Sequence, residues 1–341
     1  MKEKAIDTDK SLEELFSQGM SFIHAEDYSS AFDCFSKSAE VGHAKAQFSL
    51  GVMYLSGDGV EQDYAQALSW FRKAAEAGDT DAQCNIGLMY RNGEGVEKDY
   101  TQALSWFLKA AEEGHIDAQY NLGVMYRNGE GVKLDFVQAF SWIRKAAEVG
   151  YADAQHKLGL LYRYGKGVKQ DFVLALFWYR KAAEAGVADA QFNLGLMYHI
   201  GKEVKQDNAQ ALYWYRKAAE AGNTNAQLNL GFLYYAGIGV KQDYAQALSW
   251  FRKAAEAGHI EAQYNLGAMY EDGDGVEQDL AQALSWYWKA AEAGKAGAQY
   301  KLGIMYQQGQ GVKRDFVQAI SWYLKGTGVT MRKFFVRLWA V

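Results

Sequence analysis

The 341-residue chain contains no proline at all. This absence excludes collagen-like and proline-rich disordered chains. Because runs of β-branched residues are also few, the composition indicates a mostly helical protein. The two cysteines, Cys34 and Cys84, are too few for a disulfide framework. There is no run of about 18 apolar residues, so we expect no segment that spans a membrane.

The chain also has no excess of basic residues over acidic ones. The formal net charge is −5, which argues against a nucleic-acid-binding groove because such a groove needs a basic stripe. The first residues, "MKEKAIDTDKSLEELF", lack the apolar stretch of a secretory signal peptide. We therefore expect a cytoplasmic location, with export by a specialised secretion system as the alternative.

What the chain does have is a repeat. The segment "YAQALSWFRKAAEAG" fills residues 64–78 and returns unchanged at residues 244–258, an offset of 180 residues, or five times 36. A Leu-Gly or Ile-Gly pair recurs with the same period of 36, beginning at residues 50, 86, 122, 158, 194, 230, 266 and 302. Eight copies of one unit thus fill residues 44–326, and a fixed period in this range predicts a stacked repeat architecture.

Each unit predicts two helices. In the first, apolar residues such as Ala82, Ile86 and Met89 follow the spacing of one helical face. A Gly-x-Gly turn ends it, and an Asp followed three residues later by Gln, as in Asp63 and Gln66, marks the start of the second helix. A glycine such as Gly78 suits a left-handed helix end. The recurring Trp, for example Trp70, is expected in the core, and the glycine of each Leu-Gly pair is expected to allow close helix packing.

The two ends of the chain depart from the repeat. Residues 1–43 lack the Gly-x-Gly loop and predict a shorter, tetratricopeptide-like capping hairpin, with Cys34 as a small core residue. Residues 327–341 form a tail that mixes three cations with aromatic residues. Three alternatives remain for this tail: a cap on the last repeat, a disordered end, or a segment that binds a partner or a membrane.

The unit A-x-A-Q-x-x-L-G-x-M-Y-x-x-G-x-G-V-x-x-D-x-x-x-A-x-x-W-x-x-K-A-A-E-x-G resembles the Sel1-like repeat, which is related to the tetratricopeptide repeat. The resemblance implies an all-α, right-handed α-solenoid (superhelix) of stacked helix-turn-helix repeats. It also implies a non-enzymatic scaffold or adaptor that binds proteins, as a bacterial member of the family and as a monomer. A secreted or host-interaction effector of a bacterium is one alternative, and an RNA-binding helical repeat is another.

In tetratricopeptide-like arrays the first helices line the concave groove, so residues on their open face are candidates for partner binding. The candidates are Arg91, Arg127, Arg163, His199, Tyr235, Tyr120, His156, Phe192, Tyr264 and Tyr300. Aromatic residues and Arg are the composition of binding hot spots, and such grooves take extended or helical segments. We expect the three Arg to bind an acidic segment. The alternatives are that these Arg pair with neighbouring acids such as Glu94 and Glu130, and that the aromatic row is partly core.

Other chemistry finds little support in the sequence. The six histidines show no H-E-x-x-H spacing and are expected on the surface. The "GEGV" loops join two helices, whereas a phosphate-binding loop follows a strand. Residues 272–279 lack the ligand order of a calcium loop. We therefore predict no enzyme activity, no metal and no cofactor.

Overall fold

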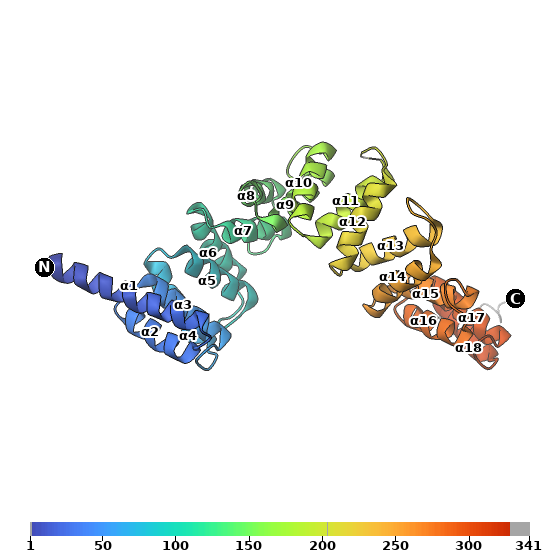
Figure 1. Cartoon of the computed structure of the whole chain (residues 1–341), viewed down its shortest axis with the longest axis horizontal. Helices are drawn as coiled ribbons and strands as arrows, with labels where there is room; N and C mark the ends of the chain where they lie inside the picture. Colours follow the sequence, from blue (N-terminus) through green and yellow to red (C-terminus); the bar gives the residue numbers. More distant parts are fainter. Residues whose placement is uncertain (1, 203, 328–341) are drawn as a thin grey trace, which may run out of the picture. The chain divides into compact units, whose positions relative to one another are not determined.

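The computed structural model describes residues 2–202 and 204–327, the side chains of residues 2–10 and 327 apart. Residues 328–341, which hold nearly all of the predicted tail, lie outside this part of the chain. Within it the regular secondary structure is helical throughout, with no strand (Figure 1). The chain divides into two units, residues 1–171 and residues 172–341. The expected all-α solenoid of helix pairs is confirmed.

In each unit, consecutive helices along the chain pack against one another. The first unit consists of α1 (Lys2–His24), α2 (Tyr28–Glu40), α3 (Ala44–Ser56), α4 (Tyr64–Glu76), α5 (Thr80–Asn92), α6 (Tyr100–Glu112), α7 (Ile116–Asn128), α8 (Phe136–Glu148) and α9 (Ala152–Tyr164). The second unit consists of α10 (Phe172–Glu184), α11 (Ala188–Ile200), α12 (Asn208–Glu220), α13 (Thr224–Ala236), α14 (Tyr244–Glu256), α15 (Ile260–Asp272), α16 (Leu280–Glu292), α17 (Ala296–Gln308) and α18 (Phe316–Thr327).

The predicted start and stop residues set the helix ends. Asp135 precedes α8, and its Oδ1 atom accepts hydrogen bonds from the backbone N–H groups of Val137 and Gln138 at 2.8 and 3.0 Å. Such a cap stabilises a helix by about 1 kcal/mol. Gly129 ends α7 with a φ of +73°, and Gly78 follows α4 with a φ of +91°. Glycine adopts these left-handed angles without the steric cost that other residues carry.

Within each pair, the glycine of the Leu-Gly motif makes room for a large side chain of the second helix. A Cβ atom on Gly87 of α5 would lie 2.8 Å from the ring of Phe107 of α6. Phe107 is fully buried, whereas Trp106, which we expected in the core, is only half-buried. The Nζ atom of Lys109 lies 5.6 Å from the centre of the Trp106 ring. In most repeats the main core position of the second helix is therefore the residue after the Trp, whereas Trp214 and Trp322 are themselves buried, as expected.

Neighbouring pairs are joined by a buried glutamine. The Nε2 atom of Gln119 in α7 donates a hydrogen bond to the carbonyl of Ala111 near the end of α6, at 3.2 Å. The same bond, eight residues back along the chain, is made by Gln47, Gln155, Gln191, Gln227, Gln263 and Gln299. The carbonyl of Ala111 also accepts from the backbone N–H of Gly114 at 3.1 Å, so the glutamine adds a second hydrogen bond at the helix end.

Candidate interaction surface

The face that the sequence singled out is formed by the first helix of each repeat. We count each repeat from residues 44, 80, 116 and so on, and call the side chains at its fifth, ninth and twelfth positions the first-helix face. Each of the ten candidate residues is at a fifth or a twelfth position. The two rows differ in burial.

The fifth-position row belongs largely to the core. The ring centres of Phe192 and Tyr215 lie 5.9 Å apart, and those of Tyr264 and Tyr287 lie 5.5 Å apart. Tyr300 pairs with Tyr323 in the same way, at 5.6 Å, but remains 59% exposed. The alternative that these aromatic residues are partly core thus describes most of the row.

Two further members of this row are also enclosed. His156 is only 4% exposed, so the expectation that all six histidines lie on the surface is wrong for this one. Tyr120 is half-buried against Tyr151, with ring centres 5.1 Å apart. Burial and the charge of Asp153 raise the pKa of Tyr120, and Arg127 opposes this shift.

In the twelfth-position row, the three Arg lie in three different environments. The Nε atom of Arg91 is 2.9 Å from Glu130 of the next repeat, as the pairing alternative predicted, and Nη1 donates to Asn121 at 3.2 Å. Burial would raise the pKa of Glu130, but hydrogen bonds from Asn128 and Arg91 outweigh it and lower this pKa. Arg163 is buried, at 9% exposure. Arg127 is half-buried and donates to Asn128 of its own helix at 3.1 Å.

The other two candidates of this row differ from the Arg. The hydroxyl of Tyr235 donates to Asp274 of the next repeat at 2.8 Å. This bond and partial burial raise the pKa of Tyr235 to about 12. His199 is half-buried, 6.2 Å from Tyr215 between ring centres. The contact from Tyr235 to Asp274 spans 39 residues, as does that from Arg91 to Glu130, so twelfth positions face the fifteenth position of the following repeat.

The acidic residues at the second position serve a structural purpose that the sequence reasoning missed. In several repeats the residue before the first helix reaches back to the acid of the preceding first helix. His115 contacts Asp81 at 2.9 Å, and Asn223 donates to Asp189 at 2.8 Å. Lys295 pairs with Glu261 in the same way. The signal was present as a constant spacing of 34 residues between the two members of each pair.

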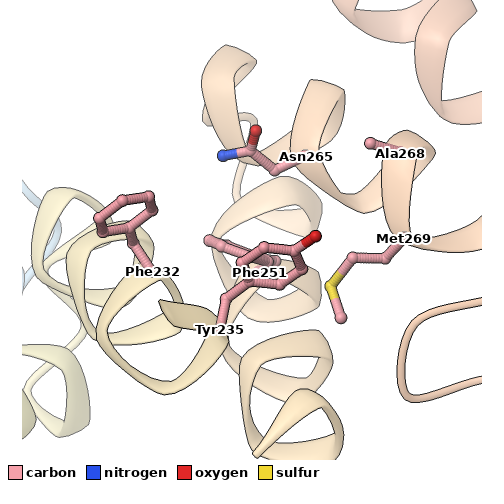
Figure 2. A pocket seen from close by; sticks show the side chains of 6 residues that line it. All are labelled: Phe232, Tyr235, Phe251, Asn265, Ala268 and Met269. Carbon is pink, nitrogen blue, oxygen red and sulfur yellow. The ribbon is translucent and has the colours of Figure 1, made fainter. Parts of the chain in front are cut away.

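Three hollows open on the first-helix face at related positions. One lies between α13 and α15, with Phe251 of α14 in its floor (Figure 2). Another lies between α1 and α3, with Phe35 of α2 in the corresponding place. The third is lined by Tyr300 of α17 and Tyr323 of α18. Apolar side chains are also exposed on second helices, for example Val137, Val173 and Val317, but these three hollows open beside first helices.

The described residues lack two features that mark other protein classes. They contain no group of three or more His, Cys, Asp or Glu side chains that could hold a metal ion. None of their helices is both long and apolar enough to cross a membrane. Cys34 and Cys84 are free and buried, and the expected core position of Cys34 is confirmed.

Stacked helix pairs joined by recurring glutamine bonds, with hollows along one face, define a helical-repeat protein. The Sel1 repeat matches this chain nine times, at residues 18–43, 44–79, 80–115, 116–151, 152–187, 188–223, 224–259, 260–295 and 296–327. The chain belongs to the Sel1 repeat family.

Two solved structures support this assignment. A Sel1 repeat protein from Oxalobacter formigenes is 35% identical, with a TM-score of 0.69 and a match covering 90% of each chain. A protective antigen present in uropathogenic Escherichia coli strains, which displays an SLR fold, is 34% identical, with a TM-score of 0.64. That match covers 96% of this chain and 82% of the antigen. No curated protein matches the chain significantly.

Proposed function

We propose that this chain is a non-enzymatic scaffold that binds a partner protein on its first-helix face, with an acidic, extended segment of the partner lying against the first unit. The observation that carries the proposal is the recurrence of hollows on this one face, each between or beside first helices and bordered by an aromatic residue of a second helix. Apolar side chains left open on one face mark interaction sites. Phe232, which is 50% exposed, and Tyr300 are of the aromatic type enriched in hot spots.

The charge pattern of the first unit supports an acidic partner segment. Where Arg91 faces Glu130, its positive charge is neutralised within the protein. One repeat later the corresponding residues are Arg127 and Lys166. Both carry positive charge, and Lys166 is exposed. A carboxylate from a partner would stabilise this pair as Glu130 stabilises Arg91.

The different surroundings of the three Arg decide which of them can be substituted without damage to the fold. Arg91 is held by Glu130 and Arg163 is buried, so reversing their charges would disturb the fold. Arg127→Glu with Lys166→Glu reverses the charge of the half-buried Arg127 and the exposed Lys166 instead. Arg144→Glu with Lys37→Glu is the matched control, because it changes the net charge equally at exposed positions on second helices.

The experiment is an affinity pull-down from native lysate with all three proteins, after circular dichroism has shown equal helix content. We expect a protein that the wild type and the control retain and that the Arg127→Glu/Lys166→Glu variant loses. If all three retain the same proteins to the same extent, the acidic segment does not bind at this pair.

Origin, location and oligomeric state are part of the proposal. We propose a bacterial protein, which the two similar structures from bacteria support. The second candidate, a bacterial host-interaction effector, is favoured by the likeness to a protective antigen of uropathogenic strains. A cytoplasmic, monomeric scaffold remains our first proposal. Fractionation of the source cells separates the two, since an effector would be recovered outside them.

A further inference from the structure

The hollow between α13 and α15 has a volume of about 160 Å³ and is lined by Phe232, Tyr235, Phe251, Asn265, Ala268 and Met269 (Figure 2). One of the residues that line it has an unusually small side chain. The ninth position of this repeat is Ala268, whereas the same position holds Leu196, Phe232 and Ile304 in other repeats of the second unit. The small Ala268 leaves more room beside Phe251 and Met269 than a Leu, Phe or Ile at this position would.

The size and lining of this pocket suit an aromatic ring. An apolar protein cavity of about 150 Å³ holds one benzene molecule. Phe251 and Met269 are 3% and 2% exposed and form an apolar floor. A thioether beside a ring adds a favourable sulfur–aromatic contact. Phe232 lines the pocket while remaining half exposed, so it would cover the side of a bound ring.

The surroundings of the pocket are negatively charged. Three acidic residues, Glu271, Asp272 and Asp274, come shortly after the lining residues Ala268 and Met269 in the sequence. The Nζ atom of Lys301 lies 2.8 Å from Glu271 and neutralises the charge of that carboxylate. Asp274 accepts a hydrogen bond from the hydroxyl of Tyr235. Asp272 is exposed and lies on α15 three residues after Met269 and four after Ala268, so it shares a helix face with these two lining residues. The exposed Asp272 and the half-buried Asp274 thus place two carboxylates close to an apolar pocket, and the nearby Lys301 is already paired with Glu271.

We propose that this pocket binds one aromatic side chain of an extended partner segment, and that the partner carries Lys or Arg directly beside that aromatic residue. The inference rests on the proposed function and adds the chemistry recognised by the second unit. The aromatic ring fills the space left by Ala268, and the cation lies against Asp272 and Asp274. A partner residue of this kind buries apolar area in the pocket and gains specificity from the charges.

The sharpest variant closes the pocket with a side chain that the fold already accepts elsewhere. Ala268→Leu introduces the residue that Leu196 places at the same position of another repeat. Ile304→Leu is its control, because it adds no volume at the equivalent position of α17. Asp272→Lys reverses the charge at the rim, and Glu256→Lys makes the same change at the exposed end of α14.

The probe is a displayed library of random dodecapeptides selected on the full chain, followed by fluorescence anisotropy of the enriched peptides against each variant. We expect enriched peptides to share an aromatic residue next to Lys or Arg. Their affinity should fall by about tenfold or more for Ala268→Leu and for Asp272→Lys, and should be unchanged for both controls.

Enriched peptides that bind Ala268→Leu as tightly as the wild type, or that are acidic beside the aromatic residue, would overturn the inference. A selection that yields no peptide preferring the wild type to Ala268→Leu would overturn it too. These results leave the Arg127 and Lys166 experiment untouched, because that pair lies in the other unit. Conversely, Ala268→Leu could weaken peptide binding while Arg127→Glu/Lys166→Glu leaves the pull-down unchanged. That result would reject only the proposed acidic partner segment and would support the pocket.

Discussion

The Nε2 atom of His115 lies 2.9 Å from Oδ1 of Asp81, so an imidazole at the start of one first helix is tied to the preceding first helix. The other ring nitrogen, Nδ1, accepts a hydrogen bond from the backbone N–H of Ala118 at 3.1 Å. The same side chain therefore caps α7 and links two repeats. Asn223 makes both kinds of contact in the second unit, to Ala226 and Asp189.

Because His115 makes both contacts, we expect its substitution by Ala to destabilise the fold and its substitution by Asn to have little effect. His115→Ala removes both bonds and should lower the free energy of unfolding by about 1–2 kcal/mol, mostly through the lost cap. His115→Asn keeps the geometry that Asn223 shows and should stay within about 0.5 kcal/mol of the wild type. Urea unfolding followed by circular dichroism measures both. Equal destabilisation by Ala and Asn would show that neither bond matters.

Asp79 holds the equivalent position before α5 and predicts a dependence on pH. Burial raises the pKa of Asp79, the like charge of Asp81 adds to this, and the hydrogen bond from Ala82 opposes it. A raised pKa means that the folded protein holds the proton more readily than the unfolded chain, so stability is lost as the pH rises through the carboxyl range. Asp79→Asn keeps an acceptor oxygen for Ala82 and cannot ionise. We expect it to raise the melting temperature at pH 7 and to have little effect near pH 3.

The reverse substitution gives the control for this prediction. Asn223→Asp places a second carboxylate beside Asp189, where Asn223 now donates a hydrogen bond at 2.8 Å. Its melting temperature should fall at neutral pH and recover in acid. A lower melting temperature for Asp79→Asn at pH 7 would contradict the argument.

Gly114 and Gly131 both have left-handed backbone angles, but only one of them has neighbours that would clash with a side chain. Substituting each by Ala therefore distinguishes the cost of backbone strain from the cost of a steric clash. Gly114 has a φ of +94°, and a Cβ atom there would meet nothing within 4 Å. Gly131 has a φ of +69°, and a Cβ atom there would lie 2.4 Å from the carbonyl oxygen of Tyr100. Gly114→Ala should therefore cost only the backbone strain, about 1 kcal/mol. Gly131→Ala should cost roughly 3 kcal/mol in total, because the loop must also move away from α6.

Thermal and urea unfolding of these two variants measures the difference directly. If both lose the same stability, the contact between the Gly-x-Gly loop and the preceding second helix contributes nothing. In that case the second glycine of the loop would be required by the turn alone.

Much of this architecture follows from the sequence, because the same local signals recur. Asp135 and Gly129 act through bonds to residues within a few positions, so the sequence predicts them without knowledge of packing. Phe107 was missed because its neighbour Trp106 is the more constant residue along the chain, whereas burial follows from the opposing Gly87. The bond from Asp81 to His115 joins different repeats, and only the three-dimensional stack shows that they meet.

The candidate surface was less predictable for the same reason. Ala268 is visible in the sequence as a small residue in an apolar row, yet a pocket arises only because Phe251 and Met269 enclose the space. Arg91, Arg127 and Arg163 look alike in sequence and differ in the partners that the fold provides. Their differences come from the fifteenth position of the next repeat and from burial, neither of which is local to the Arg.

The buried thiol of Cys84 gives a prediction about reactivity. Burial, together with the charges of Asp117 and Asp81, raises the pKa of Cys84 to about 12. Since the thiolate is the reactive species, the folded protein should hold Cys84 almost entirely as the unreactive thiol at pH 8. A Cys34→Ala variant isolates Cys84, and its reaction with Ellman's reagent should be far slower in buffer than in urea. Rapid reaction in buffer at the rate seen in urea would mean that α5 opens readily, because Cys84 is only 4% exposed in the closed structure.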